Sequence, residues 1–346
     1  MDRIARLLCH VDLSAPGIEV APYFNPAIAK RDGHPVLTLD VFGADALRDQ
    51  AAKNPNIPPE RISEIEEVDI VADASSIGEA ITRIGRAGQF GYIVSSHNFE
   101  HLPDPIRFLQ GCSVALAPGG VVSMAVPDGR ACFDHFRMPT RLGDWLSAHH
   151  RQLDQPAPET IFDFRTNSAN FYRDGTASPG CDIRTDDPSG FLPKNDLRAA
   201  YAEYLARLAA PAEYKDAHCT VTFGAALENM IADLRFLGLI DLEVIEITET
   251  VGLEFFVHLR KPIVASVLED SVFYAAREQR QRRIAGSLGS AGFGRHGWQR
   301  GTPDTPRVSL ADAVKAALFD MVPAETRKQV RDIRAWNKSR KTPGKS

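Results

Sequence analysis

The sequence GYIVSSHNFEHLPDP at residues 91–105, followed by LAPGGVVSMAVPD at residues 116–128, decides the fold. An apolar run from Phe90 to Ser96 has the composition of a buried strand, and a helical pattern follows from about residue 103 to residue 117. A Pro-Gly-Gly turn ends that helix, and a second apolar run covers residues 121–126. A strand, a crossover helix and a second strand in this order predict two parallel strands of one sheet.

The same alternation extends outward on both sides of this unit. Strand patterns occur earlier at residues 17–21, 35–40 and 68–73, and later at residues 242–247 and 254–260. The last two are joined by a turn too short for a crossover, so they must run antiparallel. We therefore expect an α/β fold with a Rossmann-like, doubly wound, mostly parallel seven-stranded sheet, a C-terminal antiparallel hairpin and a helical cap insertion.

The pattern also predicts how the chain is divided. Residues 1–128 and 220–261 carry the regular alternation and are expected to form the core domain. Residues 129–219, where proline, charge and helical stretches mix, are expected to be an inserted substrate cap. Residues 262–346 are expected to be a helical C-terminal extension, with a flexible Gly/Ser-rich linker at residues 286–301.

Composition excludes several classes of protein. No apolar run reaches membrane-spanning length and the N-terminus lacks the order of a signal peptide, so we expect a cytoplasmic protein. The formal net charge of −5 gives no general attraction to nucleic acid, and the basic tail is interpreted as a solvated segment. The cysteines are scattered and odd in number, which favours buried thiols. Adjacent His149 and His150 point apart on a helix without a third ligand, so no metal is expected.

Acidic residues follow the expected strands at the edge where such sheets bind ligands. They are Glu19, Asp40, Asp73 and Asp128, and the fourth strand ends in Ser96 and His97. A nicotinamide dinucleotide needs a Gly-x-Gly-x-x-Gly turn for its pyrophosphate, and the first turn has no glycine after residue 17. S-adenosylmethionine is cationic and has no phosphate. A carboxylate about twenty residues beyond the first strand suits its ribose diol, so Asp40 is the expected ribose ligand.

Residues 91–105 and 116–128 resemble the fourth-strand to fifth-strand segment of class I methyltransferases with the small-molecule methyltransferase domain. GIEVAP at residues 17–22, with Asn25 and Pro26, resembles the first motif of a bacterial subgroup whose genes often accompany glycan-assembly enzymes. The resemblance covers about residues 14–128 and, less specifically, residues 220–261. It implies S-adenosylmethionine as cofactor.

The resemblance also implies roles for individual residues. The first motif, with Gly17 and Asn25, is expected to bind the cofactor, and Glu19 with Ala21 to line its methionine end. The remaining cofactor-binding residues are implied to be Asp40 at the ribose, Asp73 and Ala74 at the adenine, and Ser96 with His97 beside the reacting face. The family usually has glycine where this chain has Ala21, which puts tight cofactor binding in question.

Catalytic candidates follow the fifth strand. If the acceptor is a hydroxyl, a base must take its proton, and histidine suits neutral pH. We predict His135 as this base, oriented by Asp134 or Asp128, with a packed or solvated role left open. His101, in the Glu-His pair before the next helix, is interpreted mainly as a packing residue. Aromatic residues of the cap can form either an acceptor pocket or an ordinary core: Phe162, Phe164, Phe171 and Tyr172.

The sequence thus predicts methyl transfer from S-adenosylmethionine, with a sugar, glycan or other small metabolite hydroxyl as acceptor. Two alternatives stay open. The first is a binding or scaffold protein that kept the fold and lost turnover, suggested by Ala21 and the long extension. The second is a nicotinamide-dependent oxidoreductase, which the missing glycine turn disfavours.

Overall fold

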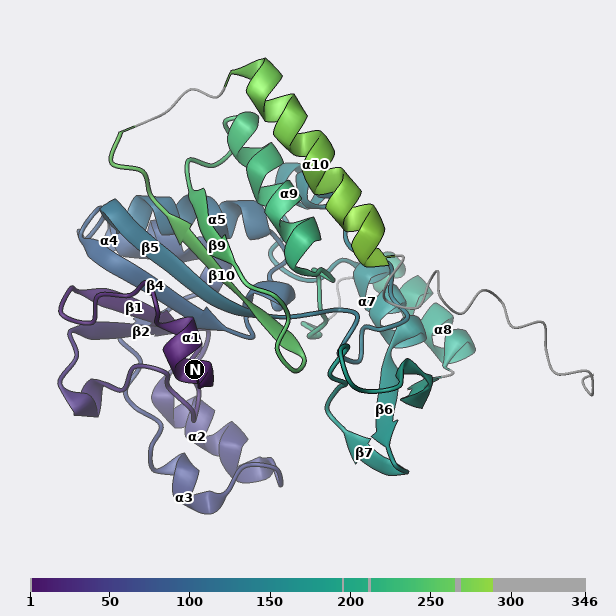
Figure 1. Cartoon of the computed structure of the whole chain (residues 1–346). Coiled ribbons are helices and arrows are strands. Elements are labelled where there is room, and N and C mark those ends of the chain that lie inside the picture. The colour runs from purple at the N-terminus through teal and green to yellow at the C-terminus, as the bar shows by residue number, and fades with distance from the viewer. Residues whose placement is uncertain (1, 195, 211–212, 265–268, 289–346) are drawn as a thin grey trace, which may run out of the picture. The chain divides into compact units, whose positions relative to one another are not determined.

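The computed structural model describes residues 2–194, 196–210, 213–264 and 269–288 (Figure 1). These residues all lie within one compact unit, Met1–Arg295. The central sheet has seven strands in the order β3-β2-β1-β4-β5-β10-β9. Their bounds are β1 Gly17–Val20, β2 Val36–Asp40, β3 Ile70–Val71, β4 Phe90–Ser96, β5 Leu116–Pro127, β9 Glu243–Ile247 and β10 Glu254–Arg260.

Strand directions confirm the predicted fold class. Strand β1 is parallel to both β2 and β4, and β4 is parallel to β5, whereas β10 is antiparallel to β5 and to β9. The chain builds outward from β1 to β3 and then returns to place β4 on the other side of β1. The order therefore reverses between β1 and β4, which is where a doubly wound sheet leaves a crevice at its carboxyl edge.

The two faces of the sheet are covered unequally. Helices α4 (Ile77–Arg83), α5 (Pro105–Ala115) and α9 (Gly224–Phe236) supply apolar side chains to the largest core cluster. Helix α10 (Asp270–Leu288) lies along α9 (Figure 1). The other face is covered more thinly, by Leu7 of α1 (Arg3–Leu7) and Ile28 of the following loop. The connection between β1 and β2 holds only one 3-10 turn, η1 (Lys30–Asp32), in agreement with its short sequence.

The region between β5 and α9 is a mixed insertion rather than a purely helical cap. It contains α6 (Leu142–His150), α7 (Pro158–Asn167), α8 (Leu197–Ala209) and a three-stranded sheet in the order β7-β6-β8. The strands are β6 Ala169–Arg173, β7 Thr176–Ser178 and β8 Phe191–Pro193. They were not predicted, because strands of three to five residues leave too little alternation to read. Trp145 of α6 packs into the main core, which ties the insertion to the sheet.

Several predicted boundaries shift. Strand β3 has two residues, and β5 begins at Leu116, before the Pro-Gly-Gly turn. Helix α2 (Ala44–Lys53) matches a helical pattern at residues 43–53, whereas the short helix α3 (Pro59–Ile62) begins at the end of a proline-rich stretch and was not predicted. Helix α10 continues to Leu288, so the first residues of the predicted linker are helical. The rest of that linker and the tail lie outside the described residues. None of the described helices combines the length and apolar composition needed to cross a bilayer.

Candidate functional site

The carboxyl ends of β1 and β4 carry residues in a strained backbone conformation. Ala21, Tyr23 and His97 have φ values of 51°, 48° and 50°, in the left-handed region that favours glycine. Such residues persist where the surrounding structure fixes a tight turn, and they concentrate at functional sites. They flank the point at which strand order reverses. The carboxyl edge of the sheet, called the rim below, therefore has a constrained backbone where the cofactor was predicted to bind.

Ala21 gives a direct test of this constraint. An L-residue in the left-handed region costs about 1–2 kcal/mol, whereas the extra freedom of unfolded glycine costs about 0.4–1 kcal/mol. We therefore expect Ala21→Gly to raise the free energy of unfolding by about 0.5–1 kcal/mol in denaturant titrations. Ala52→Gly, at an exposed position of α2, is the control and is expected to lower the free energy of unfolding by a similar amount. A destabilised Ala21→Gly variant would contradict the strain at this turn.

Glu19 lies at this rim, but its carboxylate already has hydrogen-bond partners within the protein. Its side chain is buried, and its two carboxylate oxygens accept hydrogen bonds from the backbone N–H groups of Ala27 and Ile28, at 2.6 and 3.0 Å. Burial raises the pKa of Glu19 to about 7. The structure thus gives this carboxylate a role in closing the loop after β1. Contact with the methionine end of a cofactor stays a prediction.

The other residues of the first motif also have structural partners. Gly17 begins β1, away from the carboxyl edge, and a Cβ atom there would meet the Tyr92 ring at 1.9 Å. We therefore assign Gly17 a packing role, and its contact with the cofactor stays a prediction. Asn25 is exposed and accepts a hydrogen bond from the Arg61 guanidinium at 2.6 Å.

Asp40 and Asp73 follow neighbouring strands. Asp40 is buried, its Oδ1 accepts from the Phe42 N–H at 3.1 Å, and burial raises its pKa. Val41 and Phe42, directly beyond it, are large apolar side chains that stay 54% and 44% exposed. Asp73 caps the 3-10 turn η2 (Ala74–Ser76) through the Ser75 N–H, and Ala74 is buried behind it. The roles of Asp40 at the ribose and of Asp73 with Ala74 at the adenine stay predictions.

The end of β4 is held by residues that the sequence did not point to. Arg3 of α1 donates to Ser96 Oγ at 2.7 Å and forms a two-bond ion pair with Glu254 of β10. His97 Nε2 lies 2.8 Å from the same glutamate. Burial lowers the pKa of His97, but Glu100 and Glu254 outweigh it and raise the value to about 9. Ser96 and His97 are therefore fixed in place beside the predicted reacting face.

The three predicted catalytic residues after β5 do not form one group. Asp128 is fully buried and is bound by Arg130, at 2.9 and 2.6 Å, and by Thr250 at 2.5 Å. Asp134 pairs with His218 Nδ1 at 2.5 Å and with Arg137 at 2.9 Å. Neither acid orients His135, because both carboxylates are already used by these partners. That part of the prediction is wrong.

His135 is oriented by backbone and packing instead. Its Nδ1 donates to the carbonyl oxygen of Arg130 at 2.7 Å, and its ring stacks on Phe191 with centroids 4.1 Å apart. Nε2 therefore keeps its lone pair. Burial lowers the pKa of His135 below its ordinary value, so the ring is neutral at pH 7. A mainly apolar cavity of about 230 Å³ is lined by His135 together with Gly129, Arg130, Arg137, Met138, Pro139, Val221, Thr222, Phe223 and Leu288.

The four aromatic residues of the cap follow the second of the two predicted roles, that of an ordinary core. Phe171 belongs to the small core of the cap, and Tyr172 is 37% exposed. Phe162 packs against Tyr204 of α8, at a centroid distance of 5.7 Å. Phe164 packs at 5.9 Å from the His218 ring. None of the four lines the cavity beside His135, so the structure favours ordinary cap packing.

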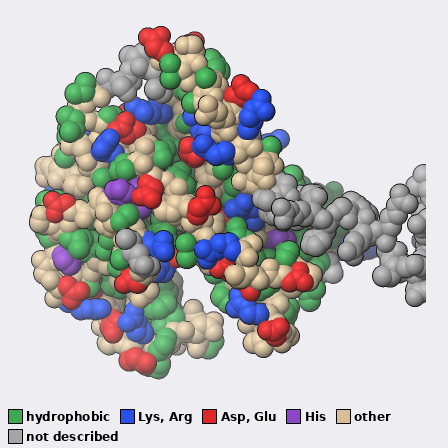
Figure 2. Space-filling model, in the orientation of Figure 1, with side chains coloured by type: hydrophobic (Ala, Val, Ile, Leu, Met, Phe, Trp, Pro, Cys, Tyr) green, Lys and Arg blue, Asp and Glu red, His purple; other side chains and the backbone are tan. Residues whose placement is uncertain are grey.

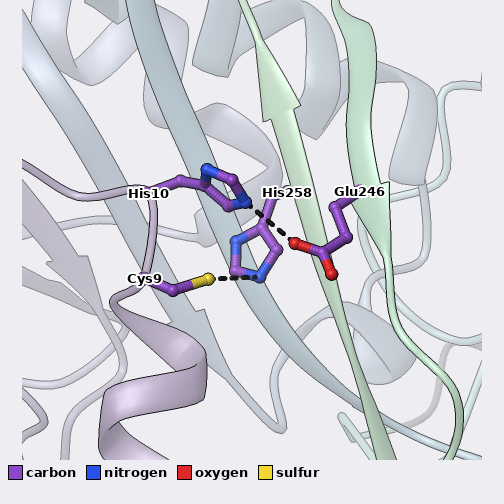
Figure 3. Close-up of side chains that lie close together, drawn as sticks. All are labelled: Cys9, His10, Glu246 and His258. Carbon is purple, nitrogen blue, oxygen red and sulfur yellow. Dashed lines mark hydrogen bonds and ion pairs between the residues drawn. The ribbon is translucent and has the colours of Figure 1, made fainter.

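A separate cluster holds the N-terminal segment on the sheet. Figure 3 shows Cys9 and His10, after α1, facing Glu246 of β9 and His258 of β10. His10 Nε2 lies 2.9 Å from Glu246, and Cys9 Sγ lies 3.5 Å from His258 Nε2. Burial, assisted by the His10 charge, lowers the pKa of His258 to about 4. Each of these side chains has a polar partner within the protein, so their close approach is explained by hydrogen bonds and ion pairs among them.

Comparison with known proteins agrees with this geometry. A family model described as a methyltransferase domain matches residues 8–164. Residues 8–164 are thus similar to methyltransferase domains. The match covers slightly less than half of the chain, and it extends past β5 into α6 and α7. No curated protein matched the sequence.

Two solved structures that are similar to this chain are named as methyltransferases. One is an S-adenosylmethionine-dependent methyltransferase from Mesorhizobium loti, with 13% identity, 73% of this chain and 95% of that chain covered, and a TM-score of 0.35. The other is a SAM-dependent methyltransferase from Methanosarcina mazei, with 13% identity, 76% and 99% coverage, and a TM-score of 0.36.

S-adenosylmethionine is the methyl donor that the sequence predicts for this chain. The residues at the carboxyl edge suit this group in two respects. Asp40 can accept hydrogen bonds from a ribose diol, and the exposed side chains of Val41 and Phe42 offer apolar surface to an adenine.

The space-filling view is indented at its lower edge, between the part that carries α2 and α3 and the part that carries β6 and β7 (Figures 1 and 2).

Proposed function

We propose that this methyltransferase transfers a methyl group from S-adenosylmethionine to a hydroxyl of a sugar, glycan or other small metabolite. The observation that carries the acceptor assignment is the neutral His135 ring, whose Nε2 is left available by its Nδ1 bond to Arg130. A neutral imidazole at the wall of a cavity can take the proton of a hydroxyl during the displacement. The cavity, at about 230 Å³, is smaller than ordinary ligand pockets of about 300–1,000 Å³, which favours a small acceptor group.

In the proposed reaction, Asp40 holds the ribose while Asp73 and Ala74 border the adenine. Ser96 and His97, fixed by Arg3 and Glu254, border the reacting face. S-adenosylmethionine supplies the methyl group, and the protein holds donor and acceptor in line, which can provide much of the rate enhancement. His135 receives the acceptor proton. The acceptor class rests on the resemblance to the glycan-associated subgroup and on the size of the cavity.

The cofactor part of the proposal is tested at Asp40. Charge-assisted hydrogen bonds contribute about 1.5–3 kcal/mol, so Asp40→Asn is expected to weaken S-adenosylmethionine binding about 10-fold to 100-fold in calorimetry. Asp45→Asn is the matched control, since the Asp45 side chain is fully exposed and pairs only with Arg48 on the described surface. Equal affinities for the Asp40→Asn variant and the wild type would remove Asp40 from the site.

The catalytic part is tested at His135. His135→Gln should lower kcat by about 10²-fold to 10⁴-fold, the usual contribution of a general base, and leave cofactor affinity unchanged. The measurement is release of S-adenosylhomocysteine with a panel of small hydroxyl acceptors. Because the pKa of His135 lies below its ordinary 6.5, wild-type activity should hold at pH 7 and decline only at lower pH. A protein that binds cofactor yet releases no product with any acceptor would instead support the scaffold alternative.

A further inference from the structure

Two histidines and a glutamate from distant segments meet beside the end of β4. Glu100 and His101 belong to the 3-10 turn η3 (Phe99–His101), and His218 lies in the segment that leads to α9. The potential ligand atoms of these three residues all lie within 4.8 Å of one another. The backbone fixes this meeting, because the N–H groups of Cys219 and Thr220 both donate to the Glu100 carbonyl, at 2.7 and 3.0 Å.

Each histidine is held by a carboxylate on its far side. His101 Nδ1 lies 2.8 Å from Asp216 Oδ1, and His218 Nδ1 lies 2.5 Å from Asp134 Oδ2. A carboxylate accepts a hydrogen bond from Nδ1–H, so in the neutral ring Nε2 keeps a lone pair. This carboxylate–histidine pairing is the arrangement that orients metal-bound histidines in proteins. Each ring, when neutral, therefore presents its Nε2 lone pair to a cation.

The glutamate supplies an independent observation. Glu100 is 1% exposed, and its Oε2 is buried without a hydrogen-bond partner among the described residues. Its Oε1 is 3.4 Å from His97 Nδ1 and 3.9 Å from His101 Nε2, which are poor distances for hydrogen bonds. A buried carboxylate oxygen without a donor is costly. A bound cation between Glu100 and the two rings would satisfy it.

We propose that Glu100, His101 and His218 bind one divalent transition-metal cation, with Zn²⁺ as the best match. Two imidazole nitrogens and one carboxylate oxygen suit zinc and its neighbours better than calcium or magnesium, which prefer all-oxygen sites. Three protein ligands leave at least one position for an oxygen ligand, as in catalytic zinc sites. On the proposed function, that ligand would be water or the acceptor hydroxyl, since the site adjoins Ser96 and His97.

The expectation that this chain binds no metal was drawn from a different pair of histidines. The sequence-based expectation of no metal considered His149 and His150, and His149 in fact pairs with Asp104 at 2.9 Å. His101 and His218 are far apart in the chain, so no spacing pattern joins them. The cluster of Cys9, His10, Glu246 and His258 is the other group in the described residues whose ligand atoms lie within 4.8 Å of one another. It has no unpartnered buried oxygen and serves here as the control site.

The test is cation binding by the full chain, with no cofactor present. After removal of metals with a chelator, the protein is titrated with Co²⁺, followed by visible absorption, and with Zn²⁺, followed by calorimetry. We expect one equivalent to bind. Glu100→Gln and His218→Ala should each weaken that binding at least 100-fold, while the double variant Cys9→Ala/His10→Ala should keep it. Circular dichroism confirms that each variant is folded.

A variant outside the ligand set separates metal binding from folding. Asp216 is 58% exposed in its side chain and contacts the site only through His101, so Asp216→Asn should fold normally. Loss of such an orienting carboxylate weakens metal binding about 10-fold to 100-fold. The proposal is overturned if the folded wild type binds neither cation at micromolar concentrations. It is also overturned if binding is lost in the Cys9→Ala/His10→Ala variant and kept in Glu100→Gln. Because S-adenosylmethionine is absent, failure of the proposed function would leave these results unchanged.

Discussion

Replacing Asp134 by alanine is expected to lower the free energy of unfolding by about 3 kcal/mol, the low end for breaking a buried ion pair. Asp134 is 1% exposed, and it satisfies both His218 and Arg137, whose side chain is 4% exposed. Its removal leaves the guanidinium buried with one partner, Asp163, and leaves His218 Nδ1 without its acceptor. The measurement is denaturant unfolding at pH 7.

Asp163 provides the matched control for this prediction. It binds the same guanidinium at 2.7 Å, but its side chain is 42% exposed. Ion pairs with an exposed partner contribute about 0–1 kcal/mol, so Asp163→Ala should change stability by less than 1 kcal/mol. Equal losses for the two variants would show that burial of Asp134 does not set the strength of this network.

The second large effect is a pH dependence of stability that depends on Glu19. The pKa of its buried carboxyl in the folded protein is raised from 4.5 to about 7, so the native state binds the proton more tightly than the unfolded state does. Stability from this group is therefore fully present below pH 4.5 and is lost as the pH rises to about 7. At about 1.4 kcal/mol per pKa unit, the loss amounts to about 3 kcal/mol.

The experiment compares Glu19→Gln with the wild type in denaturant titrations from pH 4 to pH 8. Glutamine cannot titrate, and it loses one of the two backbone acceptors whatever the pH. At low pH the variant should therefore have a lower free energy of unfolding than the wild type. As the pH rises, the wild type loses stability and the variant does not, so the difference should shift in favour of the variant by about 3 kcal/mol. Glu79→Gln, at an exposed position of α4, corrects for the loss of one surface charge. A difference that stays constant with pH would mean that Glu19 titrates normally.

The candidate site shows where sequence reasoning was sufficient. Asp40 and Asp73 were placed at the carboxyl edge because a parallel strand must end there, and the structure puts them after neighbouring strands. Ala21 was singled out by comparison with a glycine-containing motif, and its left-handed φ of 51° gives the physical reason. These residues owe their positions to local rules of strand, turn and crossover.

The orientation of side chains was less predictable. Asp134 and His135 are adjacent in the chain, yet Asp134 binds His218 and His135 binds the Arg130 carbonyl. Similarly, Arg3 and Glu254 come from opposite ends of the described chain and meet beside Ser96. No short-range pattern encodes such pairs, because they form only when the N-terminal helix and the last strand of the sheet reach the same edge.

The sequence by itself determined the parallel sheet with its antiparallel hairpin and the acidic carboxyl edge, whereas the strand order and its reversal beside β1 came from the structure. Apolar periodicity and connection length act over a few residues, so they can be read without coordinates. Tertiary structure alone decided that Glu19 closes a loop, that His135 turns to a backbone carbonyl, and that Glu100, His101 and His218 share a buried space. Each of these outcomes depends on which buried donors and acceptors find one another when distant segments pack, and burial makes every unpaired group costly.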